Sequence, residues 1–130
     1  MKDLILEYRS SPTASPNHHR ITSKDKAIII GVSKIEEFNT HLISSATEND
    51  ANVVHDIFTD KLGLKPSSVQ VLSANLSRTQ PTLKNIKKCL KETMCSMTSG
   101  STLFIYLSGQ CHDTHDKCYF LPQVALVVSR

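Results

Sequence analysis

The sequence lacks any long apolar run. A helix that crosses a bilayer needs roughly 18 consecutive apolar residues, and no stretch of the chain approaches that length. Residues 1–7 also lack the apolar core of a signal peptide. We therefore expect a cytoplasmic chain with no membrane partner. We expect its four cysteines to be reduced thiols rather than disulfides, because the cytoplasm is a reducing compartment.

A strong excess of charge is also missing. Fifteen basic residues are nearly balanced by 12 acidic ones, which leaves a net charge of +3. A dispersed excess of this size does not predict nucleic-acid binding. The lysines that fall close together are expected on the solvated face of one helix; they are Lys84, Lys87, Lys88 and Lys91. A length of 130 residues with 39% hydrophobic content predicts one globular domain with a modest core.

The first 25 residues carry little apolar material and are interrupted by Pro12 and Pro16. Such a segment buries too little apolar surface to offset the entropy lost on ordering. We predict a flexible leader over residues 1–25, followed by one domain over residues 26–130. The neighbouring His18 and His19 are then expected to be solvated rather than to ligate a metal.

Three apolar, β-branched runs predict strands at residues 26–32, 69–72 and 102–107. The first and the last show no polar alternation, which is typical of parallel strands covered on both faces. Helical periodicity fills the intervals between the runs. The order strand, helix, strand, helix, strand predicts an α/β fold, a three-layer αβα sandwich around a mostly parallel sheet. Residues 34–45 carry no strong signal and are expected to form a loop.

The first helix is expected to begin at Thr47, which forms a capping box with Asp50, and to end at Gly63 in a left-handed conformation. The second helix is expected to begin at Thr82 as its N-cap. Apolar residues at intervals of three and four predict the face that packs on the sheet; they are Leu83, Ile86, Leu90, Met94 and Met97. Cys89 lies beside that stripe and is expected to be a small core residue.

Polar, ligand-type residues follow the strand at 102–107 at once. Reacting groups in open α/β sheets gather outside the carboxyl ends of the strands, so residues 108–116 are the candidate site. The segment Tyr106-Leu-Ser-Gly-Gln-Cys111 resembles the Tyr-Phe-Ser-Gly-His-Gly box of caspase-like cysteine peptidases, the group of metacaspases, paracaspases and bacterial caspase homologues. The resemblance places Gln110 at the position of the catalytic base and Cys111 at the position of an oxyanion-hole glycine.

Further segments resemble this family in the same order along the chain. They are Gly31-Val-Ser-Lys34, Asn49-Asp-Ala51, Thr82-Leu-Lys-Asn-Ile86 and Tyr119-Phe-Leu-Pro122. The resemblance covers residues 26–122 and implies the amino-terminal half of a caspase-like, Rossmann-like domain. It also implies a role for Asp50 in lining the pocket for a basic substrate residue. Capping of the helix is the alternative role for this carboxylate.

Both catalytic groups of such a peptidase are expected to be missing. Gln110 has no pKa near neutrality, so it cannot take the proton that a nucleophilic thiol must lose. The family nucleophile lies ~50 residues after the base, which would fall beyond Arg130. We expect a caspase-like domain that is inactive as this chain and that binds a partner, without a cofactor. An active peptidase completed by a second chain would still need a base at position 110.

Residues 111–118 allow two other hypotheses. Cys111, His112, His115 and Cys118 are, by type, a complete ligand set for tetrahedral zinc, so a small metal-binding module is the alternative function. The same residues also offer a local pair of thiol and imidazole. An exposed polar loop is the simpler expectation for this segment.

The resemblance finally implies an interior position for the strand at 102–107. With few residues after it, one edge of this strand is expected to remain open for self-association or for a caspase-like partner. Pairing of this edge with residues 119–121 or with the strand-like residues 124–128 is the alternative.

Overall fold

The computed structural model describes residues 20–33, 46–75 and 77–123. Most of the predicted leader, the loop expected at residues 34–45 and the strand-like residues 124–128 lie outside these ranges. The elements are, in order, β1 (Lys26–Gly31), α1 (Ala46–Asp56), a π-helical turn η2 (Ile57–Lys61), a 3₁₀ turn η3 (Pro66–Ser68), β2 (Val69–Ser73), α2 (Leu83–Ser96), β3 (Leu103–Ser108), β4 (Cys111–Asp113) and β5 (Cys118–Phe120).

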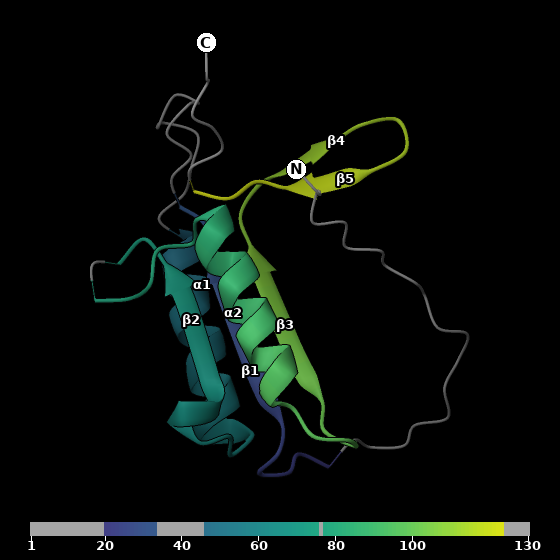
Figure 1. Cartoon of the computed structure of the whole chain (residues 1–130). Helices are drawn as coiled ribbons and strands as arrows, with labels where there is room; N and C mark the ends of the chain where they lie inside the picture. The colour runs from purple at the N-terminus through teal and green to yellow at the C-terminus, as the bar shows by residue number, and fades with distance from the viewer. Residues whose placement is uncertain (1–19, 34–45, 76, 124–130) are drawn as a thin grey trace.

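The main sheet has three parallel strands in the order β2-β1-β3. Helix α2 covers one face and α1 covers the other (Figure 1). The predicted three-layer αβα arrangement is confirmed. Both connections between these strands contain a helix. Parallel strands need such a crossover, because a tight turn can join only antiparallel strands.

Strand β1 is central because both of its faces are apolar. Ile28 and Ile30 contribute to the core beneath α2, while Ala27 and Ile29 contribute to the core beneath α1. All four are at most 1% exposed. Successive side chains of a strand point to opposite faces, so an unbroken apolar run is needed when both faces are covered. Full burial of one isoleucine side chain stabilises the fold by about 1.5–3 kcal/mol.

Helix α1 packs closely on β1 because position 31 is a glycine. A Cβ atom on Gly31 would lie 2.9 Å from the carbonyl oxygen of Thr47 and 3.3 Å from the Cβ of Ala51. The helix begins at Ala46, one residue before the expected start, so Thr47 lies inside the first turn and not at the N-cap. Gly63 has a φ of +76°, which confirms the left-handed end expected there.

Helix α2 begins as predicted, with the Thr82 hydroxyl accepting a hydrogen bond of 3.2 Å from the backbone N–H of Asn85. Its buried face consists of Ile86, Cys89 and Thr93. Met94, expected on this face, is 63% exposed. The helix is therefore rotated toward β2, which places the side bearing Met94 outside the core.

Asp25 is fully buried just before β1. Its two carboxylate oxygens each accept a 2.8 Å hydrogen bond from a backbone N–H, one from Thr22 and one from Thr102. The leader expected over residues 1–25 thus ends in a residue that ties the start of β1 to the start of β3. None of the helices in the described ranges is long and apolar enough to span a membrane.

Candidate functional site

The carboxyl ends of β1 and β3 lie side by side. The backbone N–H of Val32 donates to the carbonyl of Ser108 over 2.8 Å, which continues the ladder past Gly31. Gly109 follows and lies against the Phe120 ring. A Cβ atom at position 109 would be 3.1 Å from two carbons of that ring. The carbonyl of Gln110 then accepts from the N–H of Leu121 at 3.0 Å. Together these contacts hold the backbone on which the Gln110 side chain is exposed.

Residues 111–120 form a β-hairpin instead of the expected loop. Strands β4 and β5 are antiparallel, with Cys111 opposite Phe120, His112 opposite Tyr119 and Asp113 opposite Cys118. The hairpin extends beyond the carboxyl ends of the three sheet strands (Figure 1). All residues from 109 to 118 are exposed, so the candidate site is a solvated rim and not an enclosed cleft.

The hairpin register brings two thiols and a carboxylate onto one face. Cys111, Asp113 and Cys118 share this face because alternate strand residues point the same way and directly opposed residues share a side. A hydrogen bond to the Asp113 carboxylate, with a further one to Cys111, raises the pKa of Cys118 to about 12. Both contacts stabilise the neutral thiol, and the nearby negative charge opposes its ionisation.

The same alternation separates the four expected metal ligands. His112 points to the opposite face from Cys111, and His115 lies in the exposed turn between β4 and β5. Within the described ranges, no group of three or more His, Cys, Asp or Glu side chains could hold a metal ion. The hypothesis of a zinc module at 111–118 therefore has no geometric basis. The Cys111 thiol and the His112 imidazole point to opposite faces of the hairpin in the same way.

Asp50 lies in the amino-terminal half of α1 with its side chain exposed. The first turn of this helix contacts Gly31, which is paired with Ser108. Asp50 and Gln110 therefore both belong to the end of the sheet where the strands have their carboxyl ends. At the same end of the sheet, the Ser33 hydroxyl donates to the Glu48 carboxylate at 3.0 Å. The sequence did not predict this contact. These residues are separated by 15 positions and by a loop without periodicity, so no local pattern signals the bond.

Comparison with known proteins adds a partial similarity. Metacaspase-7 of Arabidopsis thaliana is 37% identical to this chain over 62 residues. The matched region is 47% of this chain but 15% of the plant protein, so the chain spans a small fraction of that relative. No protein-family model matches the sequence.

Proposed function

We propose that this chain is a caspase-like domain that acts by binding a protein partner through the open edge of β3 and does not itself hydrolyse peptide bonds. The partial identity to a metacaspase and the parallel αβα architecture support the family part of the proposal. Gln110 supports the catalytic part, because it follows the third strand where the family has its general base. The edge of β3 is the observation that carries the binding part.

Within the described residues, β3 pairs with β1 alone. The carbonyls of Thr102 and Ser108 accept hydrogen bonds from the β1 side. Backbone direction alternates along a strand, so Leu103, Ile105 and Leu107 direct their N–H and C=O groups away from β1. A strand with such a row of unpaired groups is a template for another chain.

The side chains at this edge favour a second copy of the same chain as the partner. Residues Leu103–Ser108 carry no charge, and the strand has none of the lysines, prolines or bulges that usually protect an edge. In a two-fold antiparallel pairing centred on Ile105, Leu103 would face Leu107 of the second copy without like-charge repulsion. Ile105 is 44% exposed, and an apolar hollow beside it is lined by Leu90, Leu107 and Phe120.

Two measurements test the proposal. Sedimentation equilibrium at high micromolar concentration is expected to show a dimer, for the full chain and for a variant lacking residues 124–130. A monomer in both cases would overturn the binding part. Aggregation only after the deletion would instead assign residues 124–130 as the cover of the edge, which also overturns it.

The catalytic part is tested with fluorogenic peptides that carry Arg, Lys or Asp before the cleaved bond. No turnover is expected, and Gln110→His is expected to remain inactive, because a base alone has no thiolate to activate. Turnover that disappears in Cys111→Ala would show that the chain has a working nucleophile and would refute this part.

A further inference from the structure

A hollow lies along the other edge of the sheet, beside β2. It has a volume of about 510 Å³ and runs past Val69, Gln70, Val71 and Leu72. This volume falls within the range of sites that bind ligands, about 300–1,000 Å³. We call this hollow the β2 groove.

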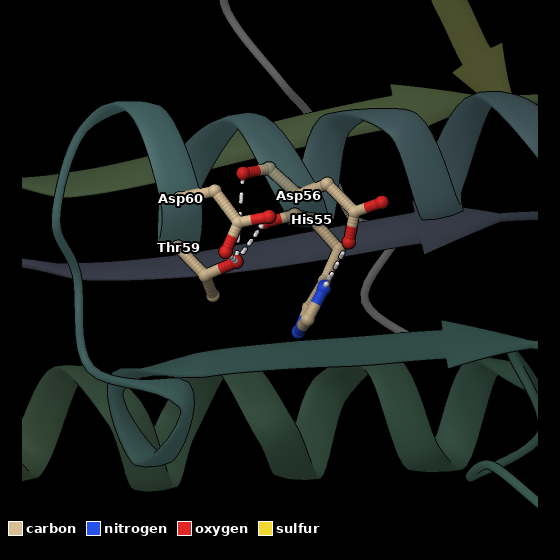
Figure 2. A network of polar contacts seen from close by, with 4 residues as sticks. All are labelled: His55, Asp56, Thr59 and Asp60. Atoms are coloured by element: carbon tan, nitrogen blue, oxygen red, sulfur yellow. Dashed lines mark hydrogen bonds and ion pairs between the residues drawn. The ribbon is translucent and has the colours of Figure 1, made fainter.

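The β2 groove receives side chains from both faces of the sheet. His55 reaches it from α1, and Figure 2 shows its ring extending from the helix toward β2. The His55 Nδ1 atom is 3.3 Å from the Asp56 carboxylate. On the opposite face, Lys88, Cys89 and Glu92 of α2 line the groove. A hollow bounded by both helices, with the edge strand between them, has the shape of a slot in the plane of the sheet.

The floor of this slot is backbone that can still form hydrogen bonds. The N–H of Ser73 points outward and donates to the carbonyl of Thr79 at 3.0 Å, and Thr79 forms a parallel bridge to Leu72. By alternation, Val71 directs its N–H and C=O groups outward, as does Val69, whose N–H already donates to the carbonyl of Pro66. The loop segment at Thr79 therefore closes the carboxyl end of the edge, and Pro66 accepts the Val69 N–H. The Val69 carbonyl and both backbone groups of Val71 are left for an added strand.

Arg78 makes the β2 groove suited to a negatively charged ligand. Its side chain is half-buried in the wall of the groove, and within the described residues no hydrogen bond or ion pair is found for the guanidinium. Lys88 is a second cation in the wall and forms an exposed pair with Glu92 at 3.9 Å. A guanidinium fork matches a carboxylate in two parallel hydrogen bonds.

From these contacts we infer that the β2 groove binds an extended, acidic segment of a partner protein. The segment adds a strand to β2, its backbone pairs with the Val69 carbonyl and with the N–H and C=O of Val71, and one Asp or Glu side chain reaches Arg78. Backbone pairing supplies affinity that does not depend on sequence, and the carboxylate supplies selectivity. This site lies on the opposite edge of the sheet from the proposed β3 interface, so an experiment can refute one of the two proposals without refuting the other.

The test uses a synthetic library of seven-residue peptides, randomised at every position and selected on the full chain. We expect recovered peptides to carry one Asp or Glu among β-branched residues. In the complex, the amide of Val71 should gain protection from hydrogen exchange while that of Ile105 stays unchanged. A library that yields no binder, or binders without an acidic residue, would overturn the inference.

Three variants complete the test. Arg78→Ala should weaken the selected peptide about tenfold, since a hydrogen bond to a charged group contributes about 1.5–3 kcal/mol. Arg78→Lys should restore part of that loss, because charge remains but the fork is gone. Lys84→Ala, an exposed cation of α2 outside the groove, is the matched control and should bind normally. Equal affinity of Arg78→Ala and Lys84→Ala for the peptide would refute the assignment of Arg78.

Discussion

Cys118 shows that full exposure does not make a thiol reactive. The thiolate is the nucleophile, and hydrogen bonds to Asp113 and Cys111 stabilise the protonated form instead. With its pKa raised to about 12, Cys118 stays protonated at every pH well below that value. Cys118, one of the two thiols on this hairpin face, is therefore not an activated nucleophile at neutral pH.

We predict that iodoacetamide labels Cys118 much more slowly than the exposed Cys95 at neutral pH. Asp113→Asn should speed the labelling of Cys118 at least about tenfold, because each unit of pKa lowering raises the thiolate fraction tenfold. Mass spectrometry of time-quenched samples measures both rates, with Cys95 as the internal reference. Equal labelling of Cys118 with and without the Asp113 carboxylate would contradict the role given to that hydrogen bond.

Cys89 illustrates the other way in which a thiol becomes inert. Burial raises its pKa, with the negative charge of Glu92 adding to the effect and a hydrogen bond with Thr93 opposing it. Its thiol also donates to the side-chain amide oxygen Oε1 of Gln70 at 2.9 Å. The expectation that Cys89 is a core residue is confirmed by its 7% exposure.

Among the elements, the start of β1 depends most on one side chain. Two backbone N–H groups would lose their acceptor without Asp25, one in the preceding turn and one at Thr102 before β3. A buried N–H group left unsatisfied costs about 1–3 kcal/mol. Asp25 therefore joins two strands that are neighbours in the sheet but distant in the sequence.

Asp25→Ala is expected to lower the free energy of unfolding by about 2 kcal/mol or more, measured by urea denaturation. The neighbouring Lys24 is exposed, so Lys24→Ala serves as the control and should change stability by less than about 0.5 kcal/mol. Equal midpoints for the two variants would mean that the Asp25 carboxylate does not hold the strands together.

As a whole molecule, the described fold is a three-stranded sheet with two different edges. The β2 edge is partly closed by Thr79 and surrounded by polar and charged side chains, whereas the β3 edge is apolar and has no strand beside it within the described ranges. The first is suited to a charged, extended ligand, and the second to an uncharged strand such as β3 itself.

Ile105→Lys is expected to weaken self-association at least tenfold while leaving the fold intact. The side chain is 44% exposed, so a lysine can reach solvent in the monomer, but two lysines would face each other in the two-fold pair. Sedimentation velocity over a concentration series provides the measurement. Val53→Lys, which replaces an apolar side chain 57% exposed on α1, is the matched control and should dimerise normally. Loss of the dimer in both variants would point to nonspecific apolar contact instead of the β3 edge.

The sequence by itself determined the three strands of the main sheet, the two helices and the layered fold. Continuous β-branched runs such as Ala27–Ile30 can be satisfied only where both faces are covered, so their pattern carries the architecture without knowledge of the neighbours. The N-cap at Thr82 and the left-handed Gly63 were equally readable, because capping is a local interaction.

Only the tertiary structure decided the features that depend on which distant segments meet. The exposure of Met94 follows from the rotation of α2 toward β2, and the burial of Asp25 follows from its bond to Thr102, 77 positions away. The position of Cys118 opposite Asp113 follows from a hairpin register that the residue types do not encode. The β2 groove combines α1, β2 and α2 side chains. Packing across the sheet decides which of these distant side chains meet, so no local periodicity in the sequence predicts them.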